Sequence, residues 1–184
     1  MRVYFRAFEM SDIDLFIKFR NDEDIYNNIT GNKFFVSTER EKKWIEDKIH
    51  NDKTNIYLAI CLKDNDQLIG YTSVNNIDLR NRNALWGSIF IDPSYRGKGI
   101  SIDVGILLLR FVFEEMPIYR FYSGLLEKNV ASMKMVAKLG FKQEGIQRSA
   151  IFKQNTFHDM VTISMLKPEY EVLYGEPGDR YIDQ

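Results

Sequence analysis

The sequence predicts a mixed α/β (α+β) fold, with a twisted, mostly antiparallel mixed sheet of about seven strands flanked by four helices. Three observations predict it. Short segments of alternating polarity are separated by polar turns, as in antiparallel hairpins. Two early segments begin at helix-capping residues. A long apolar helix then connects two strand-like segments, and such a connection makes a right-handed parallel pair.

The first half of the chain is predicted to hold one strand, two helices and three further strands. Ser11 is expected to cap the first helix and Thr38 the second, where Glu41 completes the spacing of a capping box. The Asn-rich segment between them, residues 21–35, is expected to be a loop or short turns. The expected ranges are a strand at 3–9, helices at 11–20 and 37–50, and strands at 56–62, 68–74 and 84–91.

The second half is predicted to run helix, strand, helix and a closing hairpin. The helix at 100–116 is apolar on most of its surface, so the sheet is expected to cover it. Gly140 is expected to end the second helix, because glycine adopts the left-handed conformation found there. The remaining ranges are a strand at 119–126, a helix at 130–138 and hairpin strands at 141–152 and 157–166. We expect one domain over residues 1–166 and a tail over 167–184, which docks on the body, contacts a partner or is mobile.

Composition limits the function classes. A chain of 184 residues with 45% hydrophobic residues is large enough for a core, and its net charge of −1 gives no indication of nucleic acid or an acidic membrane as a partner. The longest apolar stretch, GILLLRFVF, is far shorter than the ~20 residues of a membrane span, and the N-terminus lacks the apolar run of a signal peptide. The single cysteine, Cys61, excludes an internal disulfide and is compatible with a reducing compartment. We therefore expect a soluble, cytoplasmic protein.

The stretch DPSYRGKGIS, residues 92–101, is the strongest indication of a binding site. It lies where a strand meets the long helix, and the first amides of a helix have no partner inside that helix. Gly97 and Gly99 allow a close backbone approach, while Arg96 and Lys98 add positive charge. Together these features predict an anion site, with an ordinary polar turn as the alternative.

The spacing of the glycines excludes two other phosphate loops. A Walker loop needs four residues between its glycines, whereas one residue separates Gly97 from Gly99. A dinucleotide fingerprint needs a further glycine three positions later, where this chain has Ile102.

The same stretch resembles motif A of the GNAT superfamily (GCN5-related N-acetyltransferases), whose pattern Q/R-x-x-G-x-G/A falls here on Arg96–Ser101. The segment LLEKNVASMKMVAKLGFKQEG (125–145) resembles motif B of that superfamily. The segment FKQEGIQRSAIFKQNTFHDMV (141–161) resembles the RimJ/RimL-like branch. The resemblance covers about residues 1–166.

The resemblance implies the GNAT fold, in which the two parallel central strands splay apart, and an enzyme that binds acetyl-CoA as a co-substrate without a metal. The pantetheine arm then pairs with the splayed backbone, and the pyrophosphate lies on the amides of residues 96–101. Asn129 and Ser132 face the pantetheine and the thioester, with Ser132 as the catalytic acid, and the amides of residues 89–91 hold the oxyanion. The expected cofactor-binding residues are Ile89, Phe90, Ile91, Arg96, Gly97, Lys98, Gly99, Ile100, Ser101, Asn129 and Ser132.

The chain departs from the family pattern at three places. Ser101 stands where glycine or alanine is usual, and Val136 replaces the tyrosine that many members use as a general acid. Residues 84–87 hold no carboxylate where related enzymes carry a glutamate base, so the base is not identified. Alignment of two bound substrates can supply much of the rate, so an enzyme is still expected.

Weaker candidates are expected near the acceptor entrance, with plain surface roles as the alternative. They are Tyr71, Asn75 and Asn76 at the end of the third strand, and Arg20, Asn21 and Tyr26 after the first helix. The remaining reactive side chains are expected to be structural. Cys61 is interpreted as an inert core thiol and Asp159 as a cross-strand partner of Arg148, while His50 and His158 lack the spacing of metal ligands.

We therefore predict an acetyl-CoA-dependent N-acetyltransferase that moves an acetyl group to a primary amine by direct attack in a ternary complex. The acceptor is a protein N-terminus or a small-molecule amine, with a nucleotide-linked amino sugar as an alternative. A non-catalytic acyl-CoA-binding or sensing module, or a structural protein with an unused fold, are the other interpretations. No nucleic-acid or membrane partner is expected, and a homodimer is left open.

Overall fold

A computed structural model describes residues 1–31, 35–50 and 53–175. Its seven-stranded sheet has the order β1-β2-β3-β4-β5-β7-β6, in which β4 and β5 pair in parallel and the other neighbours pair antiparallel. The strands are β1 (Val3–Arg6), β2 (Ile56–Leu62), β3 (Leu68–Asp78), β4 (Asn83–Ile91), β5 (Arg120–Leu126), β6 (Lys142–Lys153) and β7 (Thr156–Leu166). The helices are α1 (Ile13–Asn21), α2 (Glu23–Asn28), α3 (Thr38–His50), α4 (Ile100–Glu114), α5 (Val130–Lys138) and α6 (Lys167–Tyr174), with 3₁₀ turns η1 (Met10–Asp12) and η2 (Pro93–Tyr95). The predicted mixed, mostly antiparallel sheet of about seven strands is confirmed.

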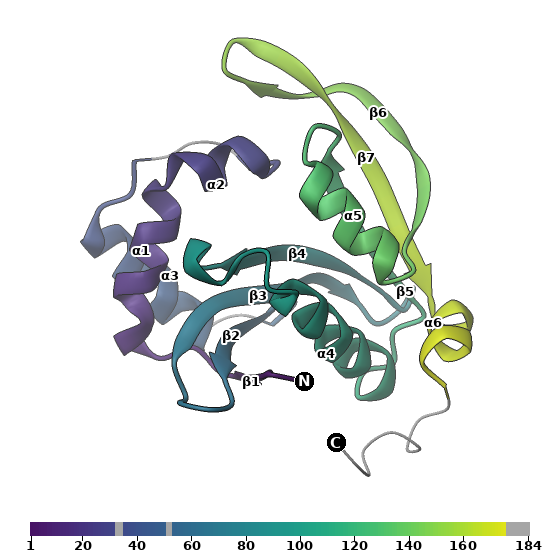
Figure 1. Cartoon of the computed structure of the whole chain (residues 1–184), viewed down its shortest axis with the longest axis horizontal. Coiled ribbons are helices and arrows are strands. Elements are labelled where there is room, and N and C mark those ends of the chain that lie inside the picture. The colour runs from purple at the N-terminus through teal and green to yellow at the C-terminus, as the bar shows by residue number, and fades with distance from the viewer. Residues whose placement is uncertain (32–34, 51–52, 176–184) are drawn as a thin grey trace.

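The sheet is covered on both faces. Figure 1 shows α1, α2 and α3 grouped on one side of the molecule, with α4 and α5 on the other. Alternate residues of β4 reach the two layers. Phe90 joins an aromatic cluster with Phe16 of α1, whereas Ile89 and Ile91 pack on the α4 side, where Leu108 is fully buried. The long apolar helix α4 is therefore covered by the sheet, as predicted.

The described residues contain two α-helices more than the four that were predicted. Helix α2 lies inside the segment 21–35 that was expected to be a loop. It forms because the carboxylate of Asp22 caps it, accepting the amide of Ile25 at 2.8 Å, and because Ile25 is buried. Helix α6 lies in the expected tail. Its buried Tyr170 donates a hydrogen bond to Glu114 of α4, so this part of the tail docks on the body.

The two predicted helix caps are wrong in detail. Ser11 lies within the 3₁₀ turn η1 and does not cap α1. At α3 the hydroxyl oxygen of Ser37 accepts the amide of Arg40 at 3.3 Å, so Ser37 takes the capping role expected of Thr38. No capping-box contact of Glu41 is found among the described residues. Its side chain is buried instead and pairs with Arg20.

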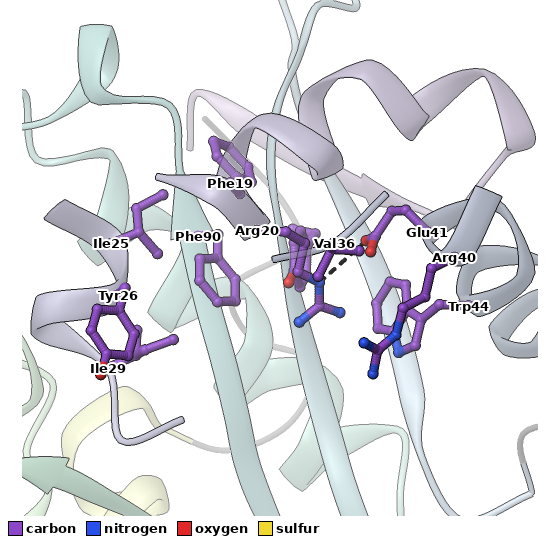
Figure 2. Close-up of a pocket in the computed structure, with 11 residues that line it drawn as sticks. Phe19, Arg20, Ile25, Tyr26, Ile29, Val36, Arg40, Glu41, Trp44 and Phe90 are labelled. Carbon is purple, nitrogen blue, oxygen red and sulfur yellow. Dashed lines mark hydrogen bonds and ion pairs between the residues drawn. The ribbon is translucent and has the colours of Figure 1, made fainter. Parts of the chain in front are cut away.

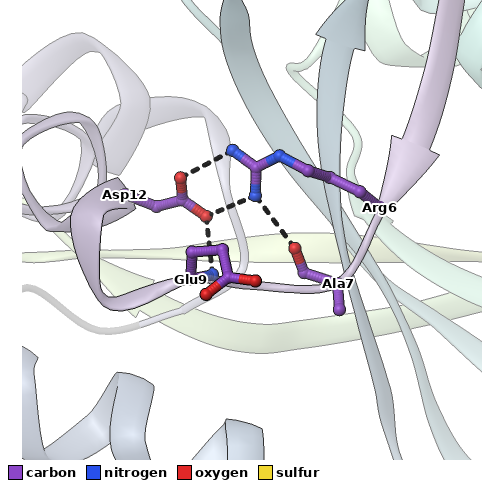
Figure 3. Close-up of polar contacts among 4 residues, drawn as sticks. All are labelled: Arg6, Ala7, Glu9 and Asp12. Carbon is purple, nitrogen blue, oxygen red and sulfur yellow. Dashed lines mark hydrogen bonds and ion pairs between the residues drawn. The ribbon is translucent and has the colours of Figure 1, made fainter.

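Asp12 fixes the connection between β1 and α1 (Figure 3). Its two carboxylate oxygens accept hydrogen bonds from the guanidinium of Arg6 at 2.7 and 2.8 Å, and one of them also accepts the amide of Glu9 at 2.9 Å. Arg6 donates further to the carbonyl of Ala7 at 2.9 Å. The hydrogen bonds to Asp12 raise the pKa of Arg6 above its ordinary value. The start of α1 is thereby tied to the sheet.

β4 and β5 pair at one end and then separate. The side chain of Ser123 donates to the carbonyl of Trp86 at 2.9 Å, just past the paired stretch. Beyond this contact β4 runs on to Ile91 and β5 to Leu126 without pairing with each other. The paired positions are Asn83–Arg120, Ala84–Phe121 and Leu85–Tyr122. The predicted splayed parallel pair is confirmed.

Candidate active site

The loop between β4 and α4 presents a row of backbone donors. Among the described residues, no acceptor is found for the amides of residues 97–101. Gly97 and Gly99 have φ of +74° and +76°, a conformation that glycine adopts without strain. The amide of Arg96, by contrast, donates to the carbonyl of Pro93 at 3.1 Å. Of the predicted anion-binding amides, the five of residues 97–101 are therefore available to a ligand, while that of Arg96 is already used.

Contacts behind this loop fix its shape and leave its outer side open. Arg2 donates to the carbonyl of Lys98 at 2.7 Å and pairs with Asp103 of α4 at 2.7 Å. A Cβ atom added at Gly97 would meet nothing within 4 Å. The side chains of Arg96 and Lys98 are exposed. The amides, the positive end of α4 and these two cations form a site suited to an anion.

Alternation along β4 decides which backbone groups face the opening between β4 and β5. The amide of Asp92 donates to the carbonyl of Ile69 in β3 at 2.8 Å. Because neighbouring residues of a strand direct their amides to opposite edges, Phe90 also faces β3, with which it is paired. Ile89 and Ile91 direct theirs toward the opening. The predicted oxyanion donors at 89–91 are thus narrowed to Ile89 and Ile91, while the side chain of Phe90 lines a cavity.

Asn129 and Ser132 lie at the start of α5, directly after β5. The side-chain oxygen of Asn129 accepts the amide of Ser132 at 3.0 Å, which caps the helix. Its nitrogen donates to the carbonyl of Asn28 in α2 at 2.7 Å. Asn129 therefore joins α5 to α2. The hydroxyl of Ser132 is partly buried and has no hydrogen-bond partner among the described residues.

Helix α2 is tied to the β5 side of the sheet by three side chains. Figure 1 shows the β6–β7 hairpin leaning toward α2. The contacts are from Asn129 to the carbonyl of Asn28 (2.7 Å), from Lys153 to the carbonyls of Tyr26 and Gly31 (2.7 Å each) and from Gln154 to the side chain of Asn27 (3.1 Å). Because α2 also packs against α1, it spans the two halves of the splayed sheet.

Lys153 is the most deeply buried of these contacts. It is 2% exposed, and its ammonium lies 3.4 Å from the ring centroid of Tyr26. Burial, reinforced by the charge of Lys128, lowers the pKa of Lys153 to about 8. A buried cation of this kind is held by its two carbonyl partners and the ring.

A cavity of about 170 Å³ lies between the first three helices and the sheet (Figure 2). Its walls are mostly aromatic or aliphatic, with three charged side chains among them. The lining residues are Phe19, Arg20, Ile25, Tyr26, Ile29, Val36, Arg40, Glu41, Trp44, Tyr71 and Phe90. Phe90 is the lining residue that belongs to β4.

An ion pair organises the cavity wall. Glu41 is 2% exposed, and one of its oxygens accepts the Nε–H of Arg20 at 3.2 Å. The guanidinium of Arg20 lies 4.3 Å from the ring centroid of Trp44. Burial raises the pKa of Tyr71 far above its ordinary value, partly opposed by the charge of Arg20. Tyr71 is therefore neutral at physiological pH and cannot serve as a base.

Only some of the residues predicted to lie near the acceptor line the cavity. Arg20, Tyr26 and Tyr71 line the cavity, and Asn21 and Asn76 do not. The side chain of Asn21 exchanges hydrogen bonds with the backbone of Val36 at 3.1 and 3.2 Å, a structural role. Asn76 is exposed, with φ of +50°.

Sequence reasoning missed seven of the lining residues. Glu41 has the spacing of a helix cap, and Trp44 and Phe19 are aromatic residues on amphipathic helices, a pattern that indicates a core. The other four are Ile25, Ile29, Val36 and Arg40.

A bulge in β4 brings two buried polar atoms together. The register between β3 and β4 shifts so that Gly87 is the extra residue. A Cβ at Gly87 would lie 2.1 Å from the side-chain nitrogen of Asn75 and 2.7 Å from the hydroxyl of Ser73. The Oγ of Ser73 and the Oδ1 of Asn75 have no hydrogen-bond partner among the described residues. They lie on the same face of β3 as Tyr71, two and four residues further on.

The other reactive side chains have structural surroundings. Asp159 accepts the amide of Ser149 at 2.7 Å, and the predicted pair with Arg148 is not among the described contacts. Cys61 is a buried free thiol. In the described part of the chain, no three or more His, Cys, Asp or Glu residues gather where they could hold a metal ion. No helix in the same part is long and apolar enough to cross a membrane.

Comparison with known proteins agrees with this geometry. A family model described as "Acetyltransferase (GNAT) domain" matches residues 2–142. The SPbeta prophage-derived N-acetyltransferase YokL of Bacillus subtilis (strain 168) is 26% identical over 170 residues, which cover 92% of this chain and 93% of YokL. The [ribosomal protein uS5]-alanine N-acetyltransferase of Escherichia coli (strain K12) is 20% identical over 123 residues, 67% of this chain and 63% of that enzyme.

A solved structure has the same fold. It is the spermidine N-acetyltransferase of Vibrio cholerae in complex with CoA and spermine. The TM-score is 0.85 at 20% sequence identity, covering 92% of this chain and 98% of the other. The GNAT fold is thereby confirmed.

Proposed function

This chain belongs to the GNAT acetyltransferase family and is an N-acetyltransferase that uses acetyl-CoA, and we propose that it acetylates a primary amine by direct attack within a ternary complex. One observation carries the proposal. The amides of residues 97–101 have no acceptor among the described residues, and the edge of β4 that faces β5 is unpaired from Trp86 to Ile91. Residues 92–96, which include the turn η2, separate these two sets of backbone groups. A diphosphate and the extended arm attached to it can therefore bind at neighbouring backbone positions.

The diphosphate of CoA is proposed to lie on the amides of residues 97–101, with Arg96 and Lys98 adding charge. The pantetheine arm then runs into the opening between β4 and β5. There its amides pair with the backbone groups of Ile89 and Ile91, as an added strand would.

The chemistry that we propose needs few side chains. The neutral amine attacks the thioester carbon, and the amide of Ile89 or Ile91 stabilises the oxyanion. The C–N bond forms first and gives the tetrahedral oxyanion, and the C–S bond breaks when the oxyanion collapses. The nitrogen loses one proton to water, and the leaving thiolate accepts one either from water or from Ser132, which then regains a proton from water.

The cavity supports a small-molecule amine as the acceptor more than the alternatives. Its volume of about 170 Å³ admits a side-chain-sized group, so a nucleotide-linked sugar would extend outside it. A protein N-terminus, the acceptor of the RimJ/RimL-like branch, is the second candidate because the E. coli relative is named as an alanine N-acetyltransferase of ribosomal protein uS5.

Three further features belong to this proposal. The catalytic domain spans residues 1–166, and α6 extends it. The protein works in the cytoplasm, consistent with a lone buried cysteine. A homodimer is retained as the assembly.

Two measurements test the proposal. Calorimetric titration with CoA should show binding, and release of free thiol from acetyl-CoA should appear with at least one amine of a panel. Tight CoA binding without turnover on any amine would favour the sensor. No CoA binding would contradict both the enzyme and the sensor.

A further inference from the structure

Arg20 is held rigidly on the cavity wall by Glu41 and Trp44. Its Nε–H donates a hydrogen bond to a carboxylate oxygen of Glu41 at 3.2 Å. The central carbon of its guanidinium lies 4.3 Å from the ring centroid of Trp44. Its two terminal nitrogens have no hydrogen-bond partner among the residues that the structure describes. Figure 2 shows them pointing away from Glu41, between the cavity walls. A guanidinium fixed in this way presents two parallel donors, the geometry that binds a carboxylate.

The charges of the cavity favour an anionic group on the acceptor. Its charged lining residues are Arg20, Arg40 and Glu41. Two arginines against one glutamate give the lining a formal charge of +1. A polyamine such as spermine, the ligand in the V. cholerae structure, carries positive charges alone and would be repelled.

The apolar walls set a second requirement. Phe19, Tyr26 and Phe90 come from different elements and enclose a space of about 170 Å³. An apolar protein cavity of about 150 Å³ accommodates benzene. The cavity therefore suits one apolar group of about the size of an aromatic ring, beside the anion bound by Arg20.

We infer that the acceptor is a small amine that carries its own carboxylate and a ring-sized apolar group, as in an aromatic α-amino acid, with the carboxylate bound by Arg20. The inference rests on the proposed function. The products are the N-acetyl amino acid and the free thiol of CoA. One proton leaves the nitrogen and one reaches the thiolate, so the step balances without a further reactant.

The test uses a matched pair of probes, L-phenylalanine and 2-phenylethylamine, which differ by the carboxylate alone. Binding is followed by the fluorescence of Trp44, which lines the cavity, with and without saturating CoA. Turnover is followed separately by thiol release. The matched variant is the double substitution Arg20→Gln with Glu41→Gln, which removes both charges together and leaves no buried carboxylate unpaired. Its melting temperature and CoA affinity serve as controls for folding.

We expect L-phenylalanine to bind at least about 30-fold more tightly than 2-phenylethylamine, the scale of a charged bidentate contact. The double variant should reduce this preference to about threefold or less, and spermidine should bind more weakly than either probe. Equal binding of the two probes, a preference that survives in the double variant, or no binding of L-phenylalanine would overturn the inference. Binding as expected without turnover would instead contradict the proposed function, so the two failures are distinguishable.

Discussion

The loop between β4 and α4 at residues 97–101, called the hinge below, differs from the cavity around Arg20 in the groups that it offers to a ligand. The hinge uses backbone amides of five consecutive residues, positioned by two glycines and the start of α4. The cavity uses side chains from three helices and two strands that are up to 71 positions apart in the chain, from Phe19 to Phe90. A backbone site of this kind depends on local sequence, whereas a side-chain site depends on how the whole chain folds.

This difference matches the two ligands that we assign. Backbone amides recognise a phosphate whatever the neighbouring side chains are, so a hinge can serve one constant co-substrate. Side chains set shape and charge, so the cavity determines the acceptor. Variants in the hinge should therefore change CoA affinity, and variants around α2 should change stability or acceptor use.

The largest expected effect is at the hinge. Gly97→Glu should weaken CoA binding by at least about 100-fold, because a carboxylate near the diphosphate costs several kcal/mol. Gly97→Ala is the control. It carries a comparable backbone strain of about 1–2 kcal/mol at φ of +74° without the charge, and its Cβ has open space. Equal losses of CoA affinity in the two variants, measured by calorimetry, would reject the hinge as the phosphate site.

The next prediction concerns the hydrogen bonds from Lys153 to the carbonyls of Tyr26 and Gly31, which hold α2. Its pKa is lowered to about 8 in the folded protein, against about 10.4 in an unfolded chain. Between these values the unfolded state binds more protons, so the contribution of Lys153 to stability rises with pH. The measured quantity is the difference in unfolding free energy between the wild type and Lys153→Met. This difference should increase in favour of the wild type by about 2 kcal/mol from pH 8 to pH 10.

Urea denaturation of both proteins at pH 7, 8, 9 and 10 measures this difference. Lys153→Met keeps the apolar stem and removes the titrating group, so other lysines cancel. A difference that stays constant over the range would show that Lys153 is solvated and does not hold α2 as described.

Ser132 tests the proposed acid. Ser132→Ala should lower kcat by about 10- to 100-fold and leave CoA affinity within about twofold, because the hydroxyl acts on the leaving thiolate. Ser132→Thr retains the hydroxyl and should keep most of the turnover. If the alanine variant turns over like the wild type, water supplies the proton and Ser132 has no catalytic role.

The smallest effect is expected at Asn129. Two substitutions there distinguish its role as the cap of α5 from its hydrogen bond to α2. Asn129→Ala should lose about 1 kcal/mol of stability, the cost of a missing helix cap. Asn129→Asp retains a capping oxygen but cannot donate to the carbonyl of Asn28. Its stability should lie near that of the wild type, while the KM for the acceptor rises because α2 is less firmly held. An unchanged KM in the aspartate variant would show that this tie does not shape the cavity.

The sequence predicted most of the sheet because its signals are local. The range of α5, Val130–Lys138, is as predicted, and Gly140 ends it with φ of +90°. The hairpin around KQNT forms with Gln154 and Asn155 at positive φ, as a tight turn requires. The glycine-spaced loop before α4 was also recognised from the sequence because it is a local pattern. Its role as the diphosphate site stays a prediction.

The cavity could not be predicted in the same way. Three residues after Thr38, Glu41 has the spacing of a capping box, and that pattern gives no sign that Ser37 caps the helix instead. Its burial depends on Arg20, which lies 21 residues earlier and approaches only through packing of α1 on α3. Helix α2 was missed because its six residues are polar apart from Ile25 and Tyr26, and its stability comes from contacts with distant residues such as Lys153.

A crystal structure with bound CoA tests the central claim most directly. The account predicts the diphosphate within hydrogen-bond distance of the amides of Gly97 to Ser101 and the pantetheine beside Ile89 and Ile91, with its thiol near Ser132 and the cavity of Arg20. A diphosphate bound elsewhere, or a pantetheine arm outside the opening between β4 and β5, would contradict it.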